Sequence, residues 1–121
     1  MLAVTAWNGD PTLTLELGIE ARDYGVLRYE ARSDAGGVAT TQIYFAGREE
    51  SFAEWRSAAQ PLALDGAWHE VRFPLFADPR WMRSGRIAGL RLDGIDRPGC
   101  FDLRGLRLEN DLDWARRWSV P

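Results

Sequence analysis

The residues of this sequence best suited to chemistry are those with planar side chains, namely tryptophan, tyrosine and arginine. Among 121 residues there are six tryptophans, three tyrosines and 15 basic residues, all of which are arginine. An aromatic ring offers an apolar face for stacking, and a guanidinium donates paired hydrogen bonds to vicinal oxygens or to a carboxylate. The composition therefore favours a binding surface built from aromatic and arginine side chains.

Residues that could act in catalysis or hold a metal are few. Cys100 and His69 are the only cysteine and histidine, whereas a zinc site needs several such ligands. A nucleophilic pair of these two stays open, because such pairs are recognised by geometry. Carboxylates such as Asp65 and Asp96 fall beside turns, where aspartate is common, and the sequence has no glycine-rich phosphate loop. We therefore predict no catalytic residue, no metal site and no nucleotide cofactor, and a small hydrolase ranks third among the functions.

The elements that position the flat side chains are β-strands, because apolar and polar residues alternate along most of the chain. The alternating runs are Thr12–Ile19, Leu27–Arg32, Ala39–Phe45, Glu70–Leu75, Ala88–Asp93, Phe101–Arg104 and Leu106–Glu109. Such alternation is typical of half-buried antiparallel strands, and the slip at Gly105 indicates a bulge. Together with a short first strand, these runs predict an all-β fold, a jelly-roll antiparallel β-sandwich.

One internal segment departs from this alternation. Residues 47–60 are polar and irregular, and we predict a loop there with a short helical turn over residues 51–57. Ser51 is the expected N-cap of that turn, and Glu54 takes the capping-box position three residues later.

The end of the chain is also different. We assign residues 2–109 to one sandwich module and residues 110–121 to a tail or linker. In the tail, Trp114 and Trp118 stand four residues apart, so they share one face of any helical turn. Two roles stay open for this pair, namely docking a neighbouring domain or folding back onto the sandwich.

Six segments follow one another in a set order, which is NGDPTLTL (8–15), YGVLRYEARS (24–33), QIYF (42–45), LDGAWHEV (64–71), IAGLRLD (87–93) and FDLRGLRL (101–108). This order resembles galactose-binding-domain-like β-sandwich modules, the jelly-roll group that contains many carbohydrate-binding modules. The resemblance covers nearly all of the sandwich module and is a likeness of pattern without a ligand motif. It implies a module that binds glycans without catalysis or that braces a neighbouring domain.

The resemblance carries two further implications. Trp68 and Trp81 stand where such modules usually hold packing aromatics. A structural calcium ion is implied near the ends of the first and last strands, where Asp10 and Glu109 are the nearest counterparts. No acidic cluster accompanies these two residues in the sequence.

The candidate ligand-binding residues are aromatic platforms and arginine clamps. Trp55 lies in the polar loop and Trp7 lies beside a turn, and loops on a rigid scaffold often carry binding sites. The other candidates point away from the apolar side of their strands, and they are Arg28, Tyr44, Arg72 and Arg91. If these strands share a sheet, the side chains form one polar plane. The alternative is a solvated face on which arginines pair with acidic residues of neighbouring strands.

Two hypotheses of different kinds follow. In the first, the chain is a non-catalytic, carbohydrate-binding-like module that binds a poly- or oligosaccharide and tethers or orients a companion glycan-active enzyme. In the second, it is a structural or protein-interaction accessory domain without a glycan ligand.

The net charge and the hydropathy of the sequence exclude some classes of partner. The net charge is -3 and no basic tail is present, which argues against nucleic acid as a partner. No apolar stretch approaches the roughly 20 residues of a membrane helix, so we predict no membrane insertion. The first residues lack the features of a signal peptide, which fits either a cytoplasmic protein or an excised module of a secreted one.

Overall fold

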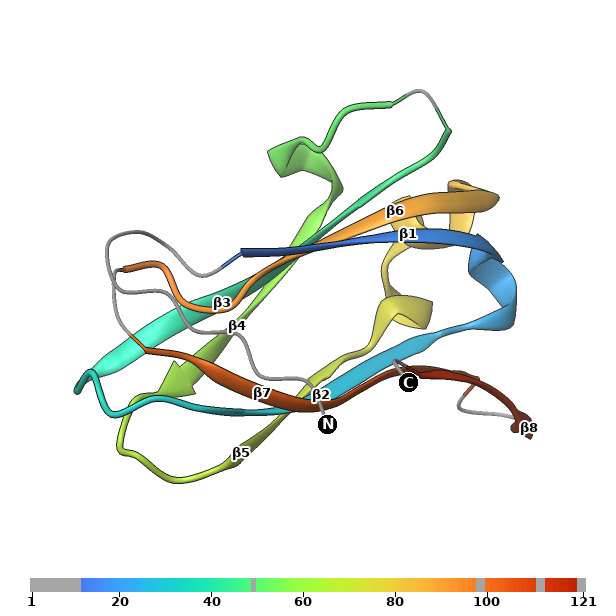
Figure 1. Cartoon of the computed structure of the whole chain (residues 1–121). Helices are drawn as coiled ribbons and strands as arrows, with labels where there is room; N and C mark the ends of the chain where they lie inside the picture. The colour runs from blue at the N-terminus through green and yellow to red at the C-terminus, as the bar shows by residue number, and fades with distance from the viewer. Residues whose placement is uncertain (1–11, 49, 98–99, 111–112, 120–121) are drawn as a thin grey trace.

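The computed structural model describes residues 12–48, 50–97 and 100–110, together with the backbone of residues 113–119. Two antiparallel sheets lie against each other as the layers of a β-sandwich (Figure 1). The first sheet has the order β1 (Thr12–Glu20), β6 (Arg86–Asp93), β3 (Val38–Ala46) and β4 (Ser57–Ala63). The second sheet has the order β5 (His69–Phe73), β2 (Val26–Arg32), β7 (Asp102–Asn110) and β8 (Asp113–Ser119). The predicted antiparallel β-sandwich is therefore confirmed.

Short helical elements connect the strands. These elements are η1 (Ala21–Asp23), η2 (Glu54–Arg56), η3 (Leu75–Ala77) and α1 (Pro79–Arg83). Asp78 begins α1 as its N-cap, since its carboxylate accepts a hydrogen bond from the Arg80 backbone N–H at 2.9 Å. No helix among the described residues is both long enough and apolar enough to span a membrane.

Alternate side chains of the strands fill the space between the sheets. In β2, for example, Leu27, Tyr29 and Ala31 are fully buried, while the alternating Arg28, Glu30 and Arg32 are partly exposed. Tyr29 spans the core, because its hydroxyl shares a 2.5 Å hydrogen bond with the Thr41 hydroxyl of the opposite sheet. The period of two in the sequence thus becomes an apolar core, which the polar contact between Tyr29 and Thr41 crosses.

Trp81 anchors α1 to this core. Its side chain is fully buried, and the indole N–H donates to the carbonyls of Ala21 and Tyr24 at 3.0 and 2.9 Å. The ring meets Phe45 edge-on, with 5.2 Å between centroids. The burial agrees with the packing role expected for Trp81, and it holds α1 in place beside the first sheet.

The predicted bulge at Gly105 is present in β7. Gly105 has a φ of +67°, and the pairing of β7 with β2 shifts between Arg28 and Glu30. A left-handed φ favours glycine, which has no Cβ to clash. The extra residue lets Leu103 and Leu106, three positions apart, both face the core.

Three segments differ from the sequence prediction. The turn predicted over residues 51–57 shortens to η2, and its N-cap is Ala53, without a capping side chain. Residues 57–63 form β4, whose small side chains and Pro61 hide the alternation. Proline is tolerated there because β4 is an edge strand. In the segment predicted as a tail, the backbone of β8 pairs with β7, with Leu108 opposite Trp118.

Candidate functional site

The four strand residues predicted to form one polar plane lie in two different sheets. Tyr44 in β3 and Arg91 in β6 belong to the first sheet, whereas Arg28 in β2 and Arg72 in β5 belong to the second. Both pairs point outward, so they face opposite sides of the sandwich. The expected single plane is wrong, because alternation assigns a residue to the outside without saying which sheet its strand joins.

The outer face of the second sheet is a network of ion pairs. Arg28 pairs with Glu70 at 3.0 Å, and Arg32 pairs with Asp102 at 2.7 Å. Arg104 pairs in the same way with a glutamate of β2 at 3.0 Å. This arrangement matches the alternative interpretation, a solvated face on which cross-strand charges neutralise one another. Pairs of this kind contribute about 0–1 kcal/mol each.

Trp68 and Arg72 also lie toward the second sheet, next to these pairs. The guanidinium carbons of Arg32 and Arg104 lie 4.6 and 3.9 Å from the Trp68 ring centroid, so Trp68 rests on paired arginines and not in the apolar core. The guanidinium of Arg72 lies 5.9 Å from the Phe76 ring. Trp68 therefore packs, as expected, but on charged groups.

The outer face of the first sheet gathers Tyr44, Arg91 and Asp93. Tyr44 is paired with Arg91 across β3 and β6, and the guanidinium lies 4.2 Å from the phenol ring centroid. Arg91 donates from Nε and Nη2 to the two carboxylate oxygens of Asp93 at 3.0 and 3.1 Å. Because Tyr44 is only 6% exposed, its ring is a support for Arg91 and is not a free stacking platform.

The loop between β3 and β4 closes over this cluster through Glu54. The Tyr44 hydroxyl donates to one oxygen of that carboxylate at 2.7 Å, and Gln42 Nε2 donates to the other at 3.1 Å. These hydrogen bonds hold the pKa of Glu54 below its usual value, while burial and the bond to Glu54 raise the pKa of Tyr44. Glu54 therefore fastens the loop to β3, which is a different role from the helix cap predicted for it.

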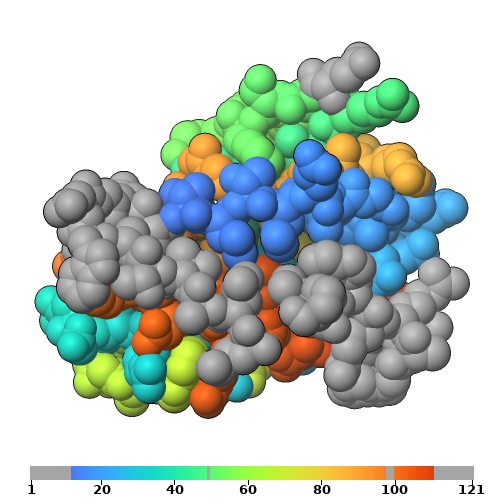
Figure 2. Space-filling view, viewed as in Figure 1, coloured from blue at the N-terminus to red at the C-terminus, as the bar shows by residue number. Residues whose placement is uncertain are grey.

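An open groove of about 560 Å³ lies beside this cluster, between β1 and the loop. Figure 2 shows the loop (green) standing above β1 (blue), with β6 visible between them. Phe52 forms one wall and packs closely over Gly89, where an added Cβ would come within 3.2 Å of the ring. The lining residues are Thr14, Leu15, Glu16, Leu17, Ala46, Gly47, Arg48, Glu50, Phe52, Ala88 and Gly89. The groove thus offers an apolar wall together with hydroxyl, carboxylate and guanidinium groups.

The two tryptophan candidates have different outcomes. Trp55 is 63% exposed on η2, and the guanidinium of Arg56 lies 4.5 Å from its ring centroid. It lines a smaller pocket with residues of α1, outside the groove. Trp7 lies outside the described residues, so its ligand role stays a prediction.

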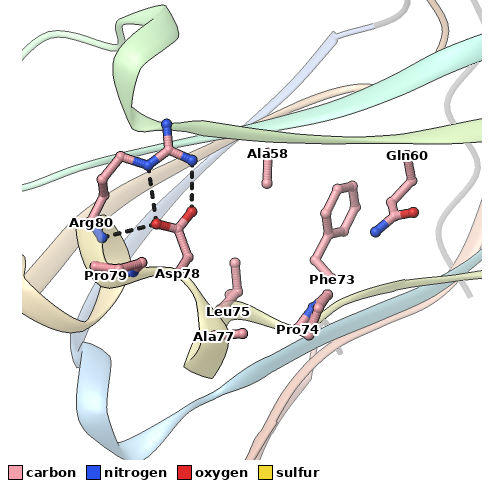
Figure 3. A pocket seen from close by; sticks show the side chains of 9 residues that line it. All are labelled: Ala58, Gln60, Phe73, Pro74, Leu75, Ala77, Asp78, Pro79 and Arg80. Atoms are coloured by element: carbon pink, nitrogen blue, oxygen red, sulfur yellow. Dashed lines mark hydrogen bonds and ion pairs between the residues drawn. The ribbon is translucent and has the colours of Figure 1, made fainter.

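A second groove opens at the side of the sandwich, between β4 and the segment from β5 to α1. Its volume is about 420 Å³. Figure 3 shows Asp78 and Arg80 at one end, and Phe73 and Gln60 at the other. The Arg80 guanidinium is engaged by the Asp78 carboxylate and by the carbonyls of Trp55 and Ser57, at 2.8 and 2.9 Å. Arg80 therefore ties α1 to the loop and to β4.

The groups considered for metal binding or nucleophilic chemistry have other partners. Glu109, the proposed calcium counterpart, is paired with Arg107 at 2.5 Å and with Arg28 at 3.7 Å, so it does not fit a calcium ligand. Asp10 lies outside the described residues, among which no three acidic, histidine or cysteine side chains gather as a metal site. Burial and nearby carboxylates raise the pKa of the Cys100 thiol, which opposes thiolate formation.

Comparison with known proteins identifies solved structures of similar fold. No protein-family model matches the sequence, and no curated protein is similar to it. Two of the similar solved structures each have a TM-score of 0.52. One is the family 11 carbohydrate-binding module of Clostridium thermocellum in complex with a β-1,3-1,4-mixed-linked tetrasaccharide, with 11% identity over 89% of this chain and 73% of that one. The other is the glycoside hydrolase domain of Endo-D from Streptococcus pneumoniae R6, with 17% identity over 81% of this chain.

The likeness is one of fold. At these identities it confirms a β-sandwich of the type found in a carbohydrate-binding module, as the resemblance in the sequence implied. This chain spans only 16% of the Endo-D structure, so the match there is to one region of a larger protein.

Sequence reasoning missed several residues of the groove and pockets. Phe52 and the arginines of α1 were not among the candidate ligand-binding residues. The signal for Phe52 is its spacing of three from Trp55 in an otherwise polar segment. The contact of Phe52 with Gly89, 37 residues further along the chain, has no signal in a single sequence.

Proposed function

We propose that this chain is a non-catalytic module that binds a poly- or oligosaccharide in the groove on the outer face of the first sheet. The observation that carries the proposal is the difference between the two outer faces. On the second sheet, arginines and carboxylates of neighbouring strands neutralise one another. On the first sheet, a groove of about 560 Å³ remains open beside the Arg91–Asp93 pair. That volume lies within the range usual for ligand sites.

The chemistry of the groove suits a sugar chain. The Phe52 ring gives an apolar wall for the C–H face of a pyranose, and Thr14, Glu16 and Arg48 supply groups that donate to or accept from hydroxyls. Because the groove is open along the sheet, a chain can lie across it without threading an end. A polymer is therefore a better ligand for this shape than a small, fully enclosed molecule.

The state of the carboxylates supports binding without hydrolysis. Glycoside hydrolysis needs one carboxylic acid with a raised pKa and a second carboxylate facing it across the bond. Here the pKa of Glu54 is lowered by its hydrogen bonds, and Asp93 is held by both arms of Arg91. By analogy of fold with the two similar structures, we propose that the module tethers or orients a glycan-active companion.

The test is affinity electrophoresis through gels that contain a soluble polysaccharide. Mixed-linkage β-1,3-1,4-glucan is the first ligand to try, because the similar carbohydrate-binding module was solved with such a tetrasaccharide. We expect retardation of the wild-type chain by at least one polysaccharide of a panel of neutral and acidic ones. Phe52→Ala should weaken the binding about fivefold or more, since one stacked ring typically contributes about 1 kcal/mol or more.

The matched control is Arg28→Gln, which removes an arginine from the opposite face. It should leave the retardation unchanged. If no polysaccharide retards the wild-type chain, binding is refuted and the structural accessory role becomes the better account. If Arg28→Gln weakens binding as much as Phe52→Ala does, our assignment of the site to the outer face of the first sheet is wrong.

A further inference from the structure

A smaller pocket lies between η2 and α1, apart from the two grooves described above. Its volume is about 380 Å³, and it is lined by Glu50, Trp55, Arg56, Arg80, Arg83 and Ser84. Three of these six side chains are guanidinium groups, and one is the most accessible tryptophan among the described residues. The pocket therefore joins a flat apolar surface to a concentration of positive charge.

Trp55 is exposed and yet supported from behind. Arg56 lies 4.5 Å from the ring centroid, and it is itself buried, with 6% of its surface exposed. Its guanidinium is held by the Glu50 carboxylate and donates to the Ser51 carbonyl at 2.7 Å. The Trp55 carbonyl also accepts from Arg80 at 2.8 Å. The indole is thus positioned before a ligand arrives, which lowers the entropic cost of stacking.

The three arginines of the pocket are not equivalent. Arg56 is neutralised by Glu50, and Arg80 is neutralised by Asp78 at 2.8 Å. Arg83, on the last turn of α1, is exposed and forms no hydrogen bond or ion pair with any residue that the structure describes. The described lining therefore carries one uncompensated positive charge, in a chain whose net charge is -3.

We propose that this pocket binds a pyranose that carries a carboxylate, with the sugar ring on Trp55 and the carboxylate on Arg83. An exposed indole suits the C–H face of a sugar, and a free guanidinium donates two parallel hydrogen bonds to a planar carboxylate. The choice of a sugar rests on the proposed function, whereas the preference for an acidic one rests on Arg83. Glu50 lines both the groove on the first sheet and this pocket, but the other lining residues differ, so the two are separate sites.

The test compares two probes that differ only at C6, methyl β-D-glucuronide and methyl β-D-glucoside. Binding is followed by NMR through the backbone and indole N–H signals, so that it can also be measured in variants without Trp55, and the Trp55 indole signal is assigned as the one lost in Trp55→Phe. We expect the glucuronide to shift the Trp55 signal and to bind about tenfold more tightly than the glucoside, as one charge-assisted pair allows. Raising the salt concentration should reduce that preference.

Two variants separate the roles of ring and charge. Arg83→Gln should remove the preference for the glucuronide, and Trp55→Ala should abolish the binding of both probes. Arg97→Gln is the matched control, because it removes one exposed arginine beside Val38, at the other end of β3. It should keep the full preference. Thermal melts confirm that each variant is folded, and Trp55→Phe offers a milder change if Trp55→Ala unfolds.

Several results would overturn the proposal. Equal binding of the two probes, or equal effects of Arg83→Gln and Arg97→Gln, would show that Arg83 does not select a carboxylate. A glucuronide response that survives Trp55→Ala but is lost in Phe52→Ala would place the sugar in the groove. Absence of any shift refutes this pocket while leaving the polysaccharide assay of the groove independent.

Discussion

Tyr29 is the polar group at the centre of the sandwich, and its removal gives a quantitative test of the core. Its hydroxyl links β2 to Thr41 of β3, and the Thr41 hydroxyl also lies 3.4 Å from the Asp93 carbonyl oxygen. Tyr29→Phe deletes one buried hydrogen bond and leaves Thr41 with a second acceptor. We therefore expect a loss of about 1 kcal/mol in the free energy of unfolding near pH 8.

The same substitution should reverse its effect at high pH. Burial raises the pKa of Tyr29 well above its usual value of about 10, so the folded chain keeps the proton when the unfolded chain loses it. A raised pKa contributes stability that is lost as the pH rises above the unfolded value. At pH 11 that loss is about 1.4 kcal/mol for wild type and zero for Tyr29→Phe. The two effects cancel between pH 10 and pH 11, and at pH 11 Tyr29→Phe should be slightly the more stable protein.

Urea unfolding at pH 8, 9, 10 and 11, followed by tryptophan fluorescence, measures this difference. The composition makes the window favourable, since the chain has no lysine to titrate there. Tyr44 and Cys100 do titrate at high pH, but they are present in both proteins and drop out of the comparison. A stability gap that stays constant from pH 8 to pH 11 would refute the protonated, buried state of Tyr29.

Three further predictions concern the scaffold and the two faces. Trp81→Phe should lower the free energy of unfolding by about 2–4 kcal/mol, because it removes ring volume and both hydrogen bonds of the indole; a loss below about 1 kcal/mol in urea titrations would contradict that anchor. Gly105→Ala should cost about 1–2 kcal/mol through its left-handed φ, and an unchanged urea midpoint would mean that the bulge relaxes freely. Arg91→Gln should weaken polysaccharide retardation in the gel assay, whereas Arg72→Gln should not; equal effects would place the site elsewhere.

The architecture was predictable where neighbouring residues decide it. The period of two sorts residues 27–32 of β2 and residues 90–93 of β6 to the inside or the outside, and Gly105 marks a residue by which the pattern slips in β7. The alternation fails in β4, where alanines and Pro61 replace large apolar residues. It fails there because β4 is held by its pairing with β3 and buries little of its own.

The candidate site was only partly predictable. Trp55 was proposed because a tryptophan in a polar loop stands out in the sequence, and the structure shows it exposed; Tyr44 and Arg91 were placed correctly on an outward face. Arg28 was grouped with them although it lies on the other side of the sandwich. Glu54 was expected to cap a helical turn, and the structure instead binds it to Tyr44 and Gln42 on β3.

The sequence by itself determined that this chain forms antiparallel strands with one apolar side, and that its exposed chemistry consists of arginine and aromatic groups. Only the tertiary structure decided which outward faces belong together, where a groove stays open and that Arg83 has no partner among the described residues. The physical reason is the separation along the sequence of the residues whose contacts decide each feature. Alternation is set by adjacent residues, whereas the order of strands in a sheet and the approach of α1 to η2 depend on contacts between residues tens of positions apart.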